Sequence, residues 1–133
     1  MLPEPKLHAL SDRCYELLED YIILTSIGLI TVKKGYQTDL ASIPQWAWSI
    51  LGVTPSTPKV IVPALIHDIL YQTHSVSYLK ANDVFLELCK ANKMVIPRRF
   101  TMYKVLDMFG WIAYYSYDND DNIYFKEFLK IVK

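Results

Sequence analysis

The stretch from Val60 to Thr73, VIVPALIHDILYQT, has the length of a helix and is almost wholly apolar around one polar pair, His67 and Asp68. Pro63 lies in its first predicted turn, where a helix tolerates proline. Burial of an unpaired carboxylate is costly, so Asp68 needs a partner or a metal ion. The pattern predicts a buried helix with a polar site. The alternative is a core histidine with satisfied hydrogen bonds beside a surface aspartate.

A second predicted helix runs from Ser77, a suitable N-cap, to about Lys93. The turn at Ser75 that separates the two helices is short, so they should be antiparallel neighbours. Asp68 lies seven residues before Ser75 and Asp83 lies eight residues after it. At about 1.5 Å of rise per residue they reach similar heights. We therefore expect Asp83 to lie within hydrogen-bond reach of His67, directly or through one water, and to fix its tautomer.

The chain before these helices favours strands. Residues 14–36 are rich in β-branched and aromatic side chains. A turn at 26–28 separates two such runs, and Gly35 closes the second. We expect a small antiparallel sheet from residues before about Asp39. An early helix over 12–21 is the alternative.

The segment between the sheet and the helices is GYQTDLASIP, residues 35–44. Gly35 permits unusual backbone angles where the sheet ends. Thr38, Asp39 and Ser42 place hydroxyls and a carboxylate in a loop, where functional residues often lie. The alternative makes Asp39 and Ser42 turn and cap residues.

The rest of the chain is predicted to be mainly helical. A short helix over 45–51 precedes a proline-containing loop, and a longer helix runs over 98–117. Its predicted core residues are Phe100, Tyr103, Val105, Leu106, Phe109 and Ile112. Residues 118–122, DNDDN, form a polar break, and 123–132 add a last helix or strand. The fold class is therefore α+β: a small N-terminal antiparallel sheet, then a helical region with an antiparallel helix hairpin, in one domain over 1–133.

Composition excludes several classes of protein. The chain has 133 residues, of which 52% are hydrophobic, so disorder is not expected. Fourteen basic residues balance fourteen acidic ones, so no nucleic-acid partner is expected. The longest apolar run, 21–32, is interrupted by polar residues, so no membrane span is expected. The N-terminus lacks the apolar region of a signal peptide. Cys14 and Cys89 each stand alone, which fits reduced thiols.

Three motifs together resemble a known family. GYQTDLASIP at 35–44, ALIHDILY at 64–71 and ANDVFLEL at 81–88 stand in the order of the family catalogued as domain of unknown function 1353, and 103–110 resembles its last helix. Members are small proteins common in bacteriophages and prophages. The resemblance implies such an origin, with a location in the host cytoplasm or the virion. It supplies no reaction.

A second resemblance is geometric. His67-Asp68-Ile69-Leu70-Tyr71 is similar to the HD-x-x-Y helix of phospholipases A2. In that family the His activates water, the adjacent Asp holds calcium, and an Asp on the antiparallel helix orients the His, as Asp83 would here. The glycine-rich calcium loop and paired cysteines of that family are missing.

The first functional hypothesis is a metal-assisted hydrolase of ester or amide bonds, with lipid or cell-wall substrates. His67 is its general base and Asp83 orients His67. Asp68 and Asp39 hold calcium, magnesium or manganese through oxygen ligands. A metal-free variant makes Ser42 the nucleophile and His67 its base.

The second hypothesis is a non-enzymatic phage component, either associated with the tail or virion or directed at a host protein. His67, Asp68, Asp83 and Asp39 then form a buried structural network. The tyrosine-rich C-terminal third, 103–124, supplies the interface with a phage structural or host protein, because Tyr and Trp are enriched at such surfaces.

Overall fold

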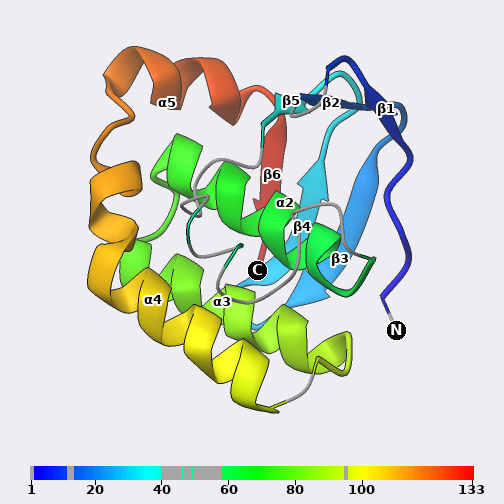
Figure 1. Cartoon of the computed structure of the whole chain (residues 1–133). Coiled ribbons are helices and arrows are strands. Elements are labelled where there is room, and N and C mark those ends of the chain that lie inside the picture. The colour runs from blue at the N-terminus through cyan, green and yellow to red at the C-terminus, as the bar shows by residue number, and fades with distance from the viewer. Residues whose placement is uncertain (1, 12–13, 40–45, 47–48, 50–57, 95) are drawn as a thin grey trace.

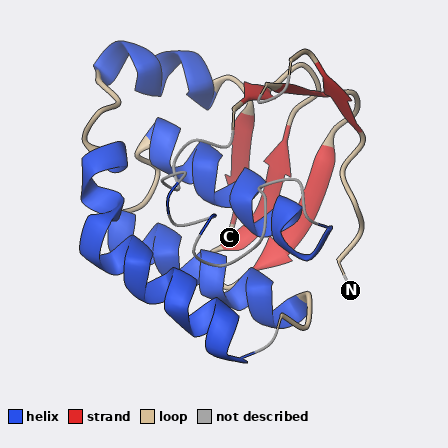
Figure 2. Cartoon of the chain, in the orientation of Figure 1, coloured by secondary structure: helices blue, strands red, loops and turns tan. Residues whose placement is uncertain are grey.

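The chain folds as strands first and helices afterwards, and one strand returns at the end. The computed structural model describes residues 2–11, 14–39, 46, 49, 58–94 and 96–133. In order, its elements are β1 (Leu7–Ala9), β2 (Tyr15–Leu17), β3 (Tyr21–Thr25), β4 (Gly28–Val32), β5 (Gln37–Thr38), α2 (Pro58–Thr73), α3 (Tyr78–Ala91), α4 (Ile96–Tyr114), α5 (Asn119–Lys126) and β6 (Leu129–Val132). The predicted α+β class is confirmed, and Figure 2 shows strands and helices as separate groups.

The strands form two antiparallel sheets, where the sequence predicted one. The first has the order β1-β2-β5 and the second the order β3-β4-β6. The predicted turn joins β3 to β4, with Thr25 opposite Gly28. The early-helix alternative is wrong, because Tyr15–Leu17 pairs with both β1 and β5.

The last strand comes from the far end of the chain. Ile131 of β6 pairs with Ile30 of β4, so the prediction that all strands precede Asp39 is wrong. Leu129 and Ile131 are half-buried while Lys130 and Val132 are exposed, which is the alternation of a strand with one covered face. Pairing across about a hundred residues cannot be seen in local sequence patterns, although a last helix or strand was left open here.

Helix α2 is the centre of the molecule. Every residue from Val62 to Thr73 is buried. Figure 1 shows α2 across the sheet β3-β4-β6, and its side chains share one core with Ile23, Ile30 and Val32 of that sheet. Helices α3 and α5 pack against it from other sides. A helix that is apolar all round must be buried in this way.

The predicted helix hairpin is confirmed. The N-cap Ser77 begins α3, and its Oγ accepts a hydrogen bond of 3.2 Å from the backbone N–H of Lys80. Helix α2 begins earlier than predicted, at Pro58, so Pro63 lies inside the helix rather than in its first turn. The predicted helix over 45–51 falls mainly outside the described residues.

The two outer helices, α4 and α5, differ from the prediction. Met102, Leu106 and Tyr114 are the buried apolar residues of α4, whereas the predicted core residues Phe100, Phe109 and Ile112 are exposed. The predicted polar break at 118–122 is instead the start of α5. Asp118 is its N-cap, and Asp118 and Asp121 form a capping box. None of the helices in the described part of the chain is long and apolar enough to cross a membrane.

Candidate functional site

His67 and Asp68 lie at the centre of α2, and neither has any exposed surface (0% each). Adjacent residues of an α-helix point about 100° apart. The two side chains therefore meet different parts of the molecule: Asp68 meets the segment around β5, and His67 meets α3. Each is the centre of a separate hydrogen-bonded network.

The Asp68 network joins α2 to the GYQTD segment. Asp68 Oδ2 accepts a short hydrogen bond from the hydroxyl of Thr38 and a bond of 3.2 Å from Nε2 of Gln72. The Tyr36 hydroxyl lies 2.5 Å from Gln72 Oε1 and 3.3 Å from Asp68 Oδ2. Asn122 of α5 donates to the backbone carbonyl of Gln72 at 2.7 Å. The network thus ties β5, α2 and α5 together.

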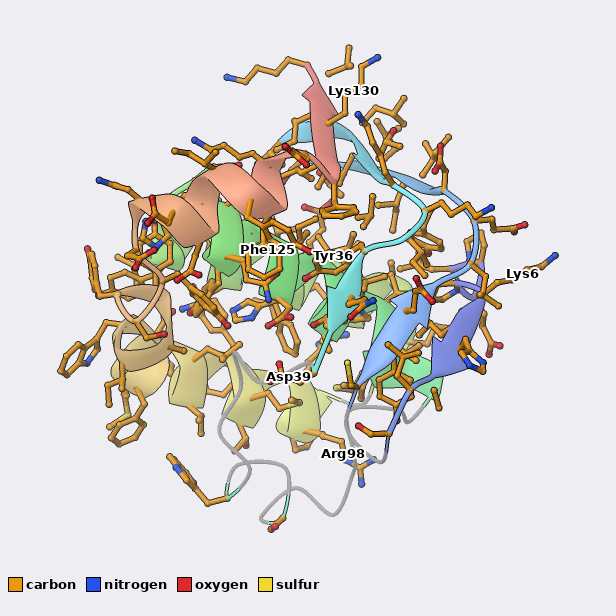
Figure 3. The ribbon with its side chains drawn as sticks, turned by 90° about the horizontal axis from the view of Figure 1, so that it is seen from above. Lys6, Tyr36, Asp39, Arg98, Phe125 and Lys130 are labelled. Carbon is orange, nitrogen blue, oxygen red and sulfur yellow. The ribbon has the colours of Figure 1, made fainter. Side chains whose placement is uncertain are left out.

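Gly35 makes this network possible. Its φ of +92° lies in the left-handed region that glycine adopts without strain, as predicted for the end of the sheet. The turn sends Tyr36 into the core, where Figure 3 shows its ring beside that of Phe125 at 6.1 Å between centroids. Burial, followed by the carboxylate of Asp68, raises the pKa of Tyr36 well above 10.0. Its hydroxyl therefore stays protonated and remains a donor.

The two predicted metal ligands share one neighbour. Burial raises the pKa of Tyr117, and the carboxylates of Asp68 and Asp39 raise it further, so both carboxylates act electrostatically on the Tyr117 hydroxyl. Asp39 is exposed, beyond the end of β5 in Figure 3, whereas Asp68 is buried. Within the described ranges, no three His, Cys, Asp or Glu side chains form a group that could hold a metal ion. A calcium, magnesium or manganese site here stays a prediction.

The second network, the Asn82 network, joins three helices. Asn82 Oδ1 lies 2.8 Å from Nε2 of His67 and accepts a hydrogen bond of 2.6 Å from the hydroxyl of Tyr71. Asn82 Nδ2 donates to Asp107 Oδ1 of α4 at 3.0 Å. The ionised carboxylate of Asp107 can only accept, so the amide of Asn82 must turn its NH₂ group toward Asp107. Oδ1 must therefore face His67 and Tyr71.

This arrangement fixes the tautomer of His67. Because Oδ1 of Asn82 is an acceptor, Nε2 of His67 carries the hydrogen and Nδ1 carries the lone pair in the neutral ring. Burial lowers the pKa of His67 from 6.5 to about 4, and the hydrogen bond to Asn82 offsets part of that shift. His67 is therefore neutral at pH 7. A neutral, oriented imidazole has the protonation state of a general base, but its side chain is sealed from solvent.

The prediction that Asp83 is the partner of His67 is wrong by one residue. Asp83 is exposed, and its Oδ1 accepts a hydrogen bond of 2.8 Å from the Tyr103 hydroxyl of α4. Counting residues from the turn gave the right height along α3 but not the direction of the side chain, which changes by about 100° per residue. Asn82, not Asp83, holds the position that the phospholipase resemblance implies for the orienting aspartate.

The structure describes four of the five predicted site residues, and it does not bring these four to one place. His67 and Asp68 face apart, and Asp39 and Asp83 lie on the surface. Ser42 lies outside the described residues. The residues that sequence reasoning missed are Tyr36, Tyr71, Gln72, Asn82 and Asp107. One signal was available: Tyr71 lies four residues after His67, so both must face the same partner.

The buried histidine makes stability depend on pH. The unfolded chain binds a proton at His67 below about pH 6.5 and the folded chain only below about pH 4, so stability is highest above pH 6.5 and falls as the pH drops toward 4. We expect His67 to contribute a loss of about 2 kcal/mol between pH 7 and pH 5. Urea unfolding of wild type and His67→Gln at both pH values measures this. Equal losses in both proteins would show that His67 is not the cause.

The comparisons with known proteins agree with the three motifs. No curated protein and no solved structure shows significant similarity to the chain. A family model described as "Protein of unknown function (DUF1353)" matches residues 15–106. That range contains most of the sheets, the hairpin of α2 and α3, and both buried networks except for Asp107 and Asn122. The chain belongs to the DUF1353 family.

Proposed function

We propose that this protein is a non-enzymatic binding component encoded by a phage or prophage. The outer side of α4 and the start of α5 are its interface, and the partner is a protein of the phage or its host. The observation that carries the proposal is the separation between the polar networks and the aromatic surface. His67, Asp68 and Asn82 are fully buried at the centres of the networks, whereas the aromatic surface is open to solvent.

The buried networks have the properties of structural joints. In the described ranges, no buried side-chain nitrogen or oxygen is left without a hydrogen-bond partner. Such satisfied networks specify one arrangement of the elements that they join. The residues come from all three family motifs: Tyr36 and Thr38, then His67 and Asp68, then Asn82. A structural role accounts for each of them without a reaction.

The outer side of α4 has the properties of an interface. Six exposed residues form a surface hereafter called the α4 face, five on the outer side of this helix and Tyr115 directly after its last residue: Phe100, Lys104, Met108, Trp111, Ile112 and Tyr115. Trp111 is 50% and Tyr115 68% exposed. The ring of Trp46 extends the face through a T-shaped contact with Phe109 at 5.3 Å. Large apolar patches on a monomer's surface mark binding sites, and Trp, Tyr, Met and Phe are enriched in protein interfaces.

A second candidate function is the hydrolysis of an ester or amide bond with His67 as general base. The observation that favours it is the chain from Asp107 through Asn82 to His67, which fixes the tautomer as the orienting carboxylate of a catalytic histidine does. Asp68 and Asp39 remain the proposed ligands of a divalent cation in this function. The same variants separate the two functions.

The test compares a change on the α4 face with a change at the buried His67 in one assay. A phage deleted for this gene is complemented with wild type, with Trp111→Ser or with His67→Gln, whose amide can still donate to Asn82 Oδ1. We expect Trp111→Ser to abolish plating at unchanged melting temperature, because an interface anchor typically contributes about 2 kcal/mol or more to binding. His67→Gln should plate like wild type at a temperature where it is folded.

Leu24→Ser is the matched control, because Leu24 is an exposed apolar residue of β3 and is not part of the α4 face. The proposal fails if Trp111→Ser plates like wild type. It also fails if folded His67→Gln does not plate and wild type alone hydrolyses lipid or cell-wall esters or amides. That second result would establish the hydrolase.

A further inference from the structure

We propose that the partner of the α4 face is the α4 face of a second copy of this chain. The two helices pair antiparallel around a two-fold axis near Met108. This inference rests on the proposed function in one respect, namely that the α4 face is an interface. It adds the identity and orientation of the partner.

The α4 face is a continuous stripe along the helix. Phe100, Lys104, Met108, Trp111 and Tyr115 are spaced by four, four, three and four residues. Residues three and four apart lie on one side of a helix, so the five side chains form one line of about 22 Å. Met108 is 63% exposed and stands near the middle of this line. A stripe of this spacing is what a second helix needs for side-by-side packing.

The two ends of the stripe carry opposite charges. Arg98 and Arg99 lie in the first turn of α4, and Lys104 follows on the stripe itself. Beyond the last turn come Asp118, Asp120 and Asp121, where α5 begins. Figure 1 shows the start of α5 near the C-terminal end of α4, and Arg98 lies in the first turn at the other end of that helix. The charge around the α4 face therefore changes from positive at one end to negative at the other, although the chain as a whole has no net charge.

This polarity is self-complementary in one orientation. In an antiparallel pair, the basic end of each α4 meets the acidic end of the other, whereas a parallel pair places like charges together. A two-fold interface must be complementary to itself, and this face meets that condition. An anionic membrane surface would attract the basic end but repel the acidic end.

The register around Met108 places suitable side chains opposite one another. Phe100 and Tyr115 are eight and seven residues from Met108, and Arg98 and Asp118 lie at opposite ends of the stripe, Asp118 beyond the helix at the start of α5. Lys104 is opposite Ile112 and next to Trp111 of the other copy. Its ammonium group lies 5.3 Å from the Phe100 ring of its own chain, so in the pair it stands between two aromatic rings.

The first experiment measures the molar mass in solution by sedimentation and light scattering over a concentration series. We expect wild type to be a dimer. Met108→Lys places two ammonium groups at the axis and should weaken dimerisation at least about 100-fold. Leu24→Lys makes the same kind of change on β3, at a residue that is 75% exposed, and should leave the dimer intact. Circular dichroism verifies that both variants are folded.

The second experiment tests the orientation. Arg98→Glu and Asp120→Lys each place like charges together in an antiparallel homodimer, so each should dimerise about tenfold more weakly at low salt. When the two variants are mixed, each heterodimer has one ion pair of reversed charge and one ion pair of wild-type charge. We therefore expect the mixture to recover wild-type dimerisation. In a parallel pair like charges already meet in wild type, so neither single change would weaken dimerisation.

The outcomes separate this inference from the proposed function. A wild-type chain that stays monomeric overturns the inference, and if Trp111→Ser still abolishes plating, the α4 face binds a different protein. A dimer that Leu24→Lys disrupts and Met108→Lys does not would use the sheet instead. Binding to anionic phospholipid vesicles without self-association would make the α4 face a membrane site and overturn both.

Discussion

Asn82→Ala is expected to lower the free energy of unfolding by about 2–5 kcal/mol, although Asn82 is one amide in a chain of 133 residues. Asn82 Oδ1 accepts from both His67 and Tyr71, and all three side chains are buried in the hairpin. Alanine leaves two buried donors without an acceptor. Each such group costs about 1–3 kcal/mol. Chemical denaturation at pH 7 measures the difference.

The neighbouring residue is a matched control. Asp83→Ala removes a hydrogen bond to the Tyr103 hydroxyl on the surface, where water can replace the lost carboxylate. We expect a loss below about 1 kcal/mol. If Asp83→Ala were the more damaging of the two changes, the side of α3 that faces His67 would be assigned wrongly.

What the sequence could predict depends on how local the signal is. The hairpin of α2 and α3 was predictable because a short turn and a fixed rise per residue determine which residues lie at one height. The partner of His67 was not predictable, because a shift of one position along α3 changes the direction of the side chain by about 100° around the helix axis. Tyr71 was the missing constraint: a residue that must face both His67 and Tyr71 points to Asn82 rather than Asp83.

Helix α4 shows a different limit. Its apolar residues are distributed all round the helix, so the pattern does not identify the side that faces the core. Gly110 marks that side in the structure, because a Cβ there would lie only 3.3 Å from Cζ of Tyr71 and closer still to its hydroxyl. A single small residue thus shows where α4 approaches α2, and Phe100, Phe109 and Ile112 are left outside. The apolar side chains on the outer side are the ones that the proposed interface uses.

The two networks hold α2 to different neighbours. The Asn82 network holds α2 to α3 and α4, whereas the Asp68 network holds it to β5 and α5. His67 and Asp68 are adjacent because one turn of a buried helix must reach both groups of neighbours. The sequence presents the His67-Asp68 pair as a catalytic signature. The pair is equally explained as the point of α2 at which the two hydrogen-bonded networks meet.

Asp68→Ala is expected to have the largest effect of all, a loss of about 3–5 kcal/mol in the free energy of unfolding. The Asp68 carboxylate accepts from Thr38 and Gln72 and lies within reach of the Tyr36 hydroxyl, all of them buried. Alanine strands these donors and loosens β5 from α2. Asp68→Asn keeps one acceptor oxygen and should cause a smaller loss.

Asp39→Ala is the control for a metal site, because Asp39 is exposed and is the other predicted ligand. In a structural network it should change stability by less than about 0.5 kcal/mol, and calcium, magnesium or manganese should not alter the ranking of the variants. In a metal site, the three ions would raise the melting temperature of wild type, and Asp68→Asn and Asp39→Ala would each reduce or abolish that gain. A ligand at about a hundred times its dissociation constant adds roughly 2.7 kcal/mol to a folded state that alone binds it, so such a gain is measurable. A shared metal-dependent gain, lost in both variants, would contradict a purely structural Asp68.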